Sequence, residues 1–372
     1  MKIVIMNNLY KPYGRGGAER IAEIEAEGML KSGHEVAVIS TSAMDGMKND
    51  YGYRTYYLKS LFIKLSEVPF FIRMFWHVWD NFNFINLLKI SRIINIEKPD
   101  LVITHNLKGL TFLVPALLKA KKIKHIHTLH DIQLLHPSGL MYYKKEETID
   151  SIPAKIYQLI NRNLFEPEFV ISPSGWLLSE HKKRGYFRKS ESRIIRNPND
   201  FIRADLIKKE IILPRLLFVG QLEPHKGIDI LIEALGGIKE EYELWLVGDG
   251  SLSEKIKKDD NPKIKMFGRL PHEKISGMMK DASLLIMPSV CYENYPTVII
   301  EALSAGLPAI ASDLGGTREI LGEEMLFAPD KESLSTKIRE VILKIKRGEL
   351  KAPPPGSLSS EDYIKEVLSL KI

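Results

Sequence analysis

The feature that most constrains the fold is a regular alternation of short apolar runs with longer helical patterns along nearly the whole chain. Apolar runs separated by helices are typical of parallel sheets with both faces covered. We expect strands at residues 2–6, 35–40, 100–105, 125–130 and 169–172 in the first half, and at 215–220, 242–248, 264–268, 283–289 and 308–312 in the second. Two such sets in series predict two Rossmann-like, doubly wound α/β domains.

The length of the chain also favours two domains, because 372 residues exceed what one ordinary core accommodates. The strand pattern is interrupted by polar segments around residues 196–214. We therefore expect a first domain over 1–200 and a second domain over 201–355.

A last helix is expected after a proline-rich break at residues 353–356. Ser359 and Asp362 are placed to cap it. Because a helix after such a break need not belong to the second domain, we expect 356–372 to return and pack on the first.

The composition narrows the class of protein. Hydrophobic residues make up 44% and charged residues 27%, which is typical of a folded globular protein. The single cysteine, Cys291, excludes a disulfide framework within one chain and fits a reducing, cytoplasmic setting. The first apolar run is too short for a signal peptide, and no window reaches the ~18 apolar residues of a membrane span. The net charge of +6 suits an anionic ligand or membrane surface, and we expect no nucleic-acid partner.

A glycine-rich turn containing Gly14, Gly16 and Gly17 links the first strand to a helix that should end near Ser32. Such a turn lets backbone amides approach an anion at the helix N-terminus. It is neither GxGxxG nor a Walker motif, so a plain tight turn is an equally good interpretation.

Histidines crowd the end of the fourth predicted strand, at His125, His127 and His130, followed by Asp131. Parallel strands place functional residues at their carboxyl ends. However, His127 and His130 differ by an odd number of positions, so a regular strand would aim them at opposite faces. The pattern therefore favours one functional histidine, His130 beside Asp131, over a metal site, and we expect no metal.

Two segments of the second half could bind an anion. Lys226 follows a strand that ends at Gly220; alone, such a lysine is usually a solvated surface charge. Pro296 fits the first position of a later helix, with Asn294 or Tyr295 as its cap. The free amides of the first helical turn, at Thr297 and Val298, would then face an anion near Lys226.

The same helix carries a glutamate in an otherwise apolar run, Glu301, and Glu293 lies just before it. An ionised buried carboxylate costs several kcal/mol unless hydrogen-bond donors satisfy it. Sugar or ribose hydroxyls are suitable donors for Glu301. The alternatives are a pair with a basic residue such as Arg318, or simple exposure to solvent.

Taken together, the chain resembles the retaining glycosyltransferases of family 4, whose GT-B fold has two Rossmann-like domains facing a central cleft. The resemblance rests on the order and spacing of segments at 16–20, 127–137, 171–185, 196–200, 219–227, 246–250, 267–275 and 293–316. It implies an acceptor-side first domain and a second domain that binds the nucleotide-sugar donor.

The resemblance assigns roles to particular residues. Glu293 and Glu301 match the family pattern E-x7-E, with Glu293 near the transferred sugar and Glu301 on the ribose. Lys226 would stabilise the leaving diphosphate and His130 would contact the donor sugar. The remaining donor-binding positions implied are Gly16, Gly17, Gly220, Gly248, Gly250, Arg269, Leu270, Asn294, Tyr295, Pro296, Thr297 and Val298.

The reaction implied is transfer of a hexose from a UDP- or GDP-linked donor to a glycan or lipid-linked acceptor, without metal or cofactor. One departure is Gln221, where the family often has an arginine. A non-catalytic nucleotide-sugar-binding subunit and an epimerase of the same fold are therefore kept as alternatives. A nicotinamide dehydrogenase is disfavoured because neither half carries GxGxxG with its downstream acid.

Residues 58–90 combine aromatic and basic side chains. The members are Phe70, Phe71, Phe75, Trp76 and Trp79, with Lys59, Lys64, Arg73 and Lys89 around them. An amphipathic helix of this kind suits a membrane interface, where a polyprenyl-linked acceptor would be found. Packing of the aromatic residues into the first domain is the alternative.

Overall fold

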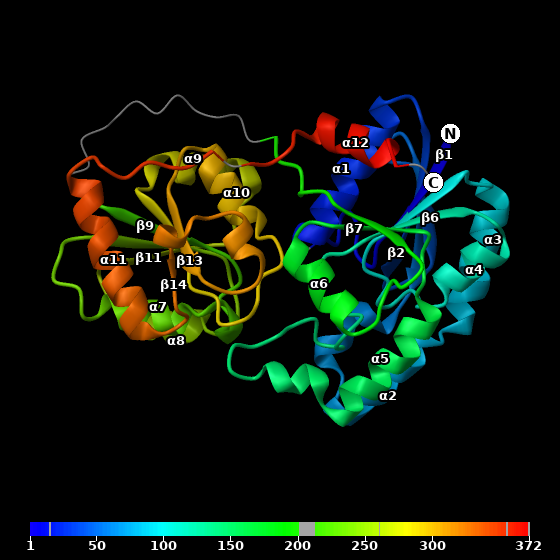
Figure 1. Ribbon diagram of the computed structural model, residues 1–372, viewed down its shortest axis with the longest axis horizontal. Coiled ribbons are helices and arrows are strands. Elements are labelled where there is room, and N and C mark those ends of the chain that lie inside the picture. Colours follow the sequence, from blue (N-terminus) through cyan, green and yellow to red (C-terminus); the bar gives the residue numbers. More distant parts are fainter. Residues whose placement is uncertain (15, 201–212, 260, 355, 371–372) are drawn as a thin grey trace. The chain divides into compact units, whose positions relative to one another are not determined.

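The computed structural model describes residues 1–14, 16–200, 213–259, 261–354 and 356–370. The chain divides into two compact units (Figure 1). Unit 1 contains Met1–Leu140, Glu147–Pro198 and Leu358–Ile372, and unit 2 contains Met141–Glu146 and Asn199–Ser357.

The sheet of unit 1 has the strand order β3-β4-β2-β1-β5-β6-β7-β8. Its strands are β1 (Lys2–Met6), β2 (Glu35–Ser42), β3 (Gly46–Lys48), β4 (Arg54–Lys59), β5 (Leu101–Thr104), β6 (Lys124–Thr128), β7 (Phe169–Ser172) and β8 (Glu191–Ile194). Neighbouring strands are parallel except for the antiparallel pair of β3 and β4. The order reverses between β1 and β5, which is where doubly wound sheets open a ligand crevice.

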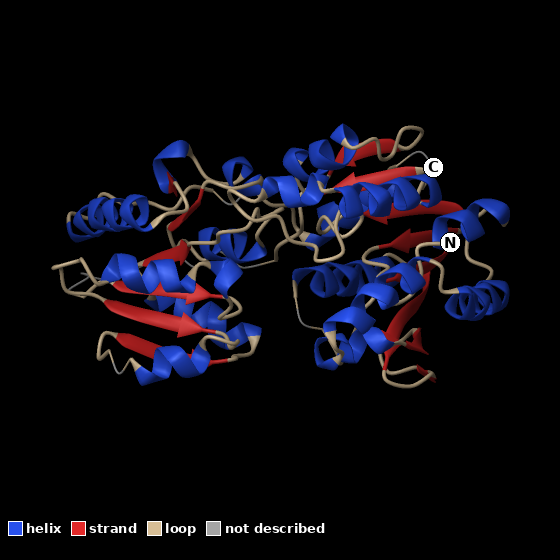
Figure 2. Cartoon of the chain, turned by 90° about the horizontal axis from the view of Figure 1, so that it is seen from below, coloured by secondary structure: helices blue, strands red, loops and turns tan. Residues whose placement is uncertain are grey.

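Helices lie on both sides of the sheet (Figure 2). They are α1 (Gly17–Lys31), η1 (Leu61–Glu67), α2 (Phe70–Asn81), α3 (Phe84–Glu97), α4 (Val114–Ala120), η2 (Glu146–Asp150), α5 (Ile152–Leu164), α6 (Gly175–Lys183) and α12 (Ser360–Leu368). The terminal helix α12 packs on α1 so closely that a β-carbon at Gly28 would lie 2.6 Å from Ile364. The Ser359 side chain accepts the Asp362 N–H and caps α12.

Unit 2 has a parallel sheet in the order β11-β10-β9-β12-β13-β14. Its strands are β9 (Arg215–Val219), β10 (Glu243–Val247), β11 (Ile264–Gly268), β12 (Leu284–Met287), β13 (Ala309–Ser312) and β14 (Leu326–Phe327). Its helices are η3 (Pro224–Lys226), α7 (Ile228–Leu235), α8 (Ser253–Lys258), α9 (His272–Asp281), α10 (Thr297–Ser304), η4 (Gly316–Glu319), η5 (Glu323–Met325) and α11 (Lys331–Lys346). A continuous apolar core joins strands and helices of this unit.

The predicted fold class is confirmed, since each predicted strand overlaps an observed one and both sheets are mainly parallel. The strands not predicted are β3, β4, β8 and β14. Three of these have no buried apolar run of useful length: β3 is exposed, β8 is mostly exposed, and β14 has two residues. β3 and β8 have little periodic signal because most of their residues face water, and β14 is buried but too short to show a period.

The predicted first domain was contiguous, whereas the structure assigns residues 141–146 to unit 2. This short segment pairs with the chain just after β12, since Tyr143 N–H donates to the Val290 carbonyl and Tyr292 N–H donates to the Met141 carbonyl. Pairing of this kind joins residues far apart in sequence, so no local pattern announces it.

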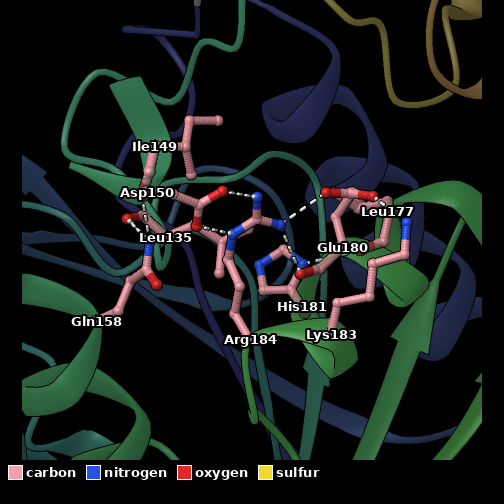
Figure 3. Close-up of polar contacts among 9 residues, drawn as sticks. All are labelled: Leu135, Ile149, Asp150, Gln158, Leu177, Glu180, His181, Lys183 and Arg184. Carbon is pink, nitrogen blue, oxygen red and sulfur yellow. Dashed lines mark hydrogen bonds and ion pairs between the residues drawn. The ribbon is translucent and has the colours of Figure 1, made fainter. Parts of the chain in front are cut away.

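The chain is anchored again in unit 1 directly after this segment (Figure 3). Arg184, at the end of α6, makes two parallel hydrogen bonds to Asp150, at 3.0 and 2.9 Å. The same guanidinium bonds Glu180 at 2.6 Å. A bidentate arginine–carboxylate pair holds geometry better than a point charge does, so Asp150 is fixed against α6 where α5 begins.

One buried acid in unit 1 predicts a pH effect on stability. The Asp80 side chain, 3% exposed, accepts the Gly109 N–H at 2.7 Å, while its other oxygen has no hydrogen-bond partner among the described residues. Burial raises the pKa of Asp80 to about 7, despite the opposing effects of Gly109 and Lys108. Native protein then keeps a proton that the unfolded chain loses near pH 4.

We therefore expect the stability contributed by Asp80 to be present at low pH and to be lost as the pH rises through about 7. Between pH 5 and 8 the loss should be on the order of 2 kcal/mol. Asp80→Asn removes this proton equilibrium, so urea unfolding at the two pH values should show a smaller loss than in the wild type. Exposed Asp50→Asn is the control. An unchanged pH dependence in Asp80→Asn would contradict the expectation.

Candidate active site

Two of the predicted catalytic residues are in contact in unit 2. Lys226 lies in η3, which follows β9, and Glu293 lies in the loop after β12, the strand next to β9. The Lys226 Nζ atom lies 2.7 Å from Glu293 Oε1, and the Ser289 hydroxyl donates to the same oxygen at 2.6 Å. Parallel pairing of the two strands brings their carboxyl ends, and so these side chains, to one edge.

Both charges of this ion pair are partly removed from water, since the side chains of Lys226 and Glu293 are 27% and 14% exposed. Burial by itself raises the pKa of Glu293, but Lys226 and the Ser289 hydroxyl outweigh it, so the pKa lies below its usual value. Burial by itself lowers the pKa of Lys226, yet attraction to Glu293 leaves it above its usual value. Each residue therefore keeps the other charged.

Glycines let the backbone close around this ion pair. Gly227, directly after Lys226, has φ 70°, and a β-carbon there would lie 1.8 Å from the Pro288 carbonyl oxygen. Gly315 has φ 69°, and its β-carbon would lie 2.2 Å from the Glu293 carbonyl oxygen. At both positions a residue other than glycine would be strained by the positive φ, and its β-carbon would clash with the neighbouring carbonyl oxygen. The Gly316 N–H donates to that Glu293 carbonyl at 2.7 Å, which fixes the loop.

The helix after Glu293 begins one residue later than predicted. Pro296 is its N-cap residue rather than its first helical residue, and α10 starts at Thr297. The first-turn amides of Thr297 and Val298 still point out of the N-terminus, as in any helix. Asn294 is half-buried and Tyr295 is buried in the loop before it.

Glu301 has a different neighbour from the one considered in the sequence. Its Oε1 lies 3.4 Å from His272 Nε2, and its side chain is 19% exposed. Arg318, the basic residue considered as a partner, is instead hydrogen-bonded to Asp313. Glu301 therefore lies beside a basic residue, as that alternative expected, but the residue is His272 and not Arg318.

Three of the glycines assigned to the donor by resemblance, Gly220, Gly248 and Gly250, lie just after β9 and β10. Gly248 has φ 137°, and a β-carbon there would lie 1.8 Å from the Gly220 carbonyl oxygen. Its N–H donates to the Gly268 carbonyl at 2.8 Å. Gly250 donates its N–H to Asp249 and Ser253 side chains. Exposed Arg269 and half-buried Leu270 follow β11 at this edge.

In unit 1, His130 lies just past β6, and its Nε2 atom is 2.7 Å from His105 Nδ1. The two rings are stacked with centroids 5.0 Å apart. Burial and the neighbouring His105 lower the pKa of His130 well below its usual value, so the ring is neutral. Asp131 does not orient His130, because it bonds to Asn106 and Gln133.

The other strand histidines have structural surroundings. The Thr104 hydroxyl lies 2.8 Å from His125 Nε2 and 2.9 Å from His127 Nδ1. The His127 ring also packs edge-on against Phe165. Within the described residues, no three His, Cys, Asp or Glu side chains are grouped as metal ligands would be.

A small pocket in unit 1 is lined by His105, Asn106, His127, His130, Asp131 and Gln133, among others. Burial raises the pKa of Asp131 to about 6. The glycine-rich turn lies in the same unit: Gly16 is the extended N-cap residue of α1, and Gly17 is its first residue. Arg15 lies outside the described residues.

Several polar residues in these two sites were not predicted. They are Ser289, His272, His105 and Glu25. Ser289 ends a predicted strand and His105 ends another, so their positions at sheet edges were a usable signal. Glu25 and His272 lie within ordinary helical patterns, and no sequence signal distinguished them.

Comparisons with known proteins bear on the family and the fold of the chain. The family model described as Glycosyltransferase Family 4 matches residues 15–201, and the model described as Glycosyl transferases group 1 matches residues 213–344. An uncharacterized glycosyltransferase of Methanocaldococcus jannaschii is 31% identical over 278 residues, which cover 69% of this chain and 70% of that protein. An uncharacterized 42.6 kDa protein in the cps region of Klebsiella pneumoniae is 26% identical, with 86% of this chain and 87% of that protein covered.

Solved structures extend the likeness to the fold. The Anabaena protein HepE in complex with UDP superposes with a TM-score of 0.70 at 18% identity, covering 99% of this chain and 98% of that chain. Such a likeness shows the GT-B architecture of two parallel-sheet domains.

The glycine after Lys226 offers a test of how the site is held. Gly227→Ala should cost about 3 kcal/mol or more, because positive φ and a backbone clash act together. Gly348→Ala is the matched control: it has φ 66° but nothing within 4 Å of the added β-carbon, so it should cost about 1 kcal/mol. Urea unfolding measures both, and equal losses would show that the clash is relieved without cost.

Proposed function

The chain belongs to glycosyltransferase family 4, and we propose that it transfers a hexose from a UDP- or GDP-linked donor to a glycan or lipid-linked acceptor. The contact between Lys226 and Glu293 carries this proposal, because it places a cation and a carboxylate at the strand ends where a donor would bind. The solved complex of HepE with UDP supports a nucleotide ligand for this fold.

The proposed chemistry proceeds with retention of anomeric configuration. The acceptor hydroxyl oxygen forms a bond to the anomeric carbon on the face that the diphosphate leaves, and its proton passes to the departing phosphate oxygen. Negative charge grows on the diphosphate, where the Lys226 ammonium and the first amides of α10 would stabilise it. These groups replace a metal in the proposal, so the reaction would need no metal or cofactor.

In this proposal each glutamate binds a different part of the donor. Lys226 exchanges Glu293 for the diphosphate, and Glu293 then accepts hydrogen bonds from hydroxyls of the transferred sugar. Glu301, whose nearest basic neighbour is His272 at 3.4 Å, accepts from the ribose. From unit 1, His130 contacts the donor sugar.

Because Gln221 stands where the family often has an arginine, two alternatives to a transferase are kept, and the same experiment tests both. With one cation fewer than family members often have, the chain could bind a nucleotide sugar without transferring it. An epimerase would need further acid–base groups beside the sugar. The relatives favour transfer, because the similar Methanocaldococcus protein is an uncharacterized glycosyltransferase.

The proposed donor class is tested by thermal shift with UDP, GDP, ADP and their sugars. A ligand at ~100 times its Kd should stabilise the protein by about 2.7 kcal/mol. Hydrolysis of that donor should fall by roughly 10²–10³-fold in Lys226→Ala, since a preorganised charge at the leaving group is lost. Lys255→Ala, an exposed lysine of the same unit paired with Asp229, is the control and should keep wild-type rates.

Stabilisation by none of these ligands would contradict the proposed donor class. Stabilisation with no hydrolysis or transfer in the wild type would favour the binding-subunit alternative. A rate in Lys226→Ala equal to that in Lys255→Ala would remove Lys226 from the reaction.

We also propose that unit 1 attaches peripherally to the cytoplasmic face of a membrane through α2 and α3. Trp79, Phe84, Ile85 and Leu88 are each between 55% and 62% exposed. Phe84, Ile85 and Leu88 share one face of α3 by helical spacing. Exposed apolar side chains at this density suit an interface. No helix in the described part of the chain has the length and apolar character needed to cross a membrane.

The predicted amphipathic segment is only partly available for that role. Trp76 is 7% exposed and packs into unit 1. Lys89 is paired with Asp45, so the apolar side chains support the proposal more than this charge does. The side chains of Phe70, Phe71, Phe75 and Lys64 lie outside the described ones.

Leu88→Gln should reduce binding to phosphatidylglycerol–phosphatidylcholine vesicles at low salt, because it removes one apolar side chain worth about 1.5–3 kcal/mol on full burial. Leu343→Gln, at an exposed leucine of α11 in unit 2, should leave binding unchanged. Co-sedimentation measures both. A wild-type protein that stays in the supernatant would reject the membrane contact.

A further inference from the structure

A chain of four polar side chains, three of them buried and the last, His130, half-buried, runs through unit 1. The Tyr363 hydroxyl on α12 donates to Glu25 Oε1 on α1 at 2.7 Å. Glu25 Oε2 lies 3.0 Å from His105 Nε2, and His105 Nδ1 lies 2.7 Å from His130 Nε2. Tyr363 is 1% exposed, and Glu25 and His105 are 0% exposed.

Glu25 places a buried carboxylate on the core-facing side of α1, which is energetically unfavourable without hydrogen-bond partners. The neighbouring buried residues of α1 include Ile21, Ala22, Ala26 and Met29, so the face is otherwise apolar. An ionised carboxylate there costs several kcal/mol unless donors satisfy it. Tyr363 contacts one carboxylate oxygen and His105 contacts the other, so each oxygen has a hydrogen-bond partner.

With Glu25 ionised and a single proton on His105, which the proposal takes as its premise, the chemistry of these groups sets the direction of each hydrogen bond. An ionised carboxylate only accepts, so His105 must carry its proton on Nε2 to donate to Glu25. A neutral His105 then has an unprotonated Nδ1, which accepts from the Nε2–H of His130. A neutral His130 ring then carries its one proton on Nε2, and its Nδ1 has the character of an acceptor.

We propose that Tyr363, Glu25 and His105 are positioning residues that hold His130 in its Nε2–H tautomer, with Nδ1 set to accept a hydrogen bond from a sugar hydroxyl. The proposed hydrogen bond from a sugar hydroxyl to His130 rests on the proposed function of the protein. The proposed tautomer of His130 does not depend on that function. Carboxylates that orient a histidine through its far nitrogen act this way in other sites.

The position of α12 follows from the same contacts. Tyr363 lies 338 positions after Glu25 in the sequence, yet it supplies one of the two donors that satisfy the buried carboxylate. The end of the chain thus contributes to the orientation of His130 through the core of unit 1.

The tautomer is tested by nitrogen-15 NMR of histidine-labelled full-length protein without added ligand. The His130 signals are assigned by their loss in His130→Gln. We expect the wild-type His130 ring to be protonated on Nε2, and Glu25→Leu to convert it to a mixture of tautomers. Protonation on Nδ1 in the wild type, or an unchanged tautomer in Glu25→Leu, would overturn the proposal whether or not the protein is active.

A second variant guards against misfolding of Glu25→Leu. Tyr363→Phe removes one buried hydroxyl, and Tyr53→Phe is its matched control, since Tyr53 is 3% exposed and its hydroxyl bonds the buried Tyr10 hydroxyl at 2.5 Å. With UDP-glucose as donor, Tyr363→Phe should lower kcat for hydrolysis about tenfold with KM within threefold, while Tyr53→Phe keeps both.

Equal losses of kcat in the two tyrosine variants would overturn the positioning role, because both remove a hydroxyl from the same core. If UDP-glucose neither binds nor is hydrolysed by the wild type, that donor fails, and the NMR measurement alone decides whether the four side chains set the tautomer.

Discussion

Parallel pairing of strands is the constraint on which both candidate sites depend. It brings the carboxyl ends of neighbouring strands to one edge of each sheet, and the loops after those ends carry the polar side chains. In unit 2, β9 and β12 are neighbours, so the loops that hold Lys226 and Glu293 meet although 67 positions separate the two residues. In unit 1, β5 and β6 bring His105 and His130 together in the same way.

Each unit holds a carboxylate where water is scarce, and each unit satisfies it differently. Unit 2 sets opposite charges in contact, so that Lys226 and Glu293 keep one another ionised. Unit 1 satisfies one buried carboxylate, Glu25, with a tyrosine hydroxyl and an imidazole. The first arrangement leaves two opposite charges partly exposed at the strand ends, whereas the second places its carboxylate out of contact with water.

Most of the fold could be predicted because its signal is local. Buried parallel strands are apolar along their length, and helices between them have their own period, so strands such as 2–6 and 169–172 were found with their observed bounds. Edge strands such as β3 and β8 were not predicted because exposed residues interrupt any apolar run. The membership of residues 141–146 in unit 2 was not predicted because the segment with which they pair is remote in sequence.

The candidate site could be predicted in part for a similar reason. Lys226 and Glu293 lie in the loops that follow predicted strands and His130 is the last residue of one, which is where functional residues of such sheets gather. Their hydrogen-bond partners were harder to predict. The only sequence signal for Ser289 and His105 is their position at the end of a strand, and Glu25 resembles any other residue of an amphipathic helix.

The amino-acid sequence alone determined that this protein is a two-part α/β chain with its polar motifs at strand ends, because hydrophobic period and helix termination are properties of neighbouring residues. Tertiary structure decided which of those motifs touch. Contacts between Lys226 and Glu293, or between Tyr363 and Glu25, depend on the order of strands in a sheet and on the path of the last helix, which are set by packing of the whole unit.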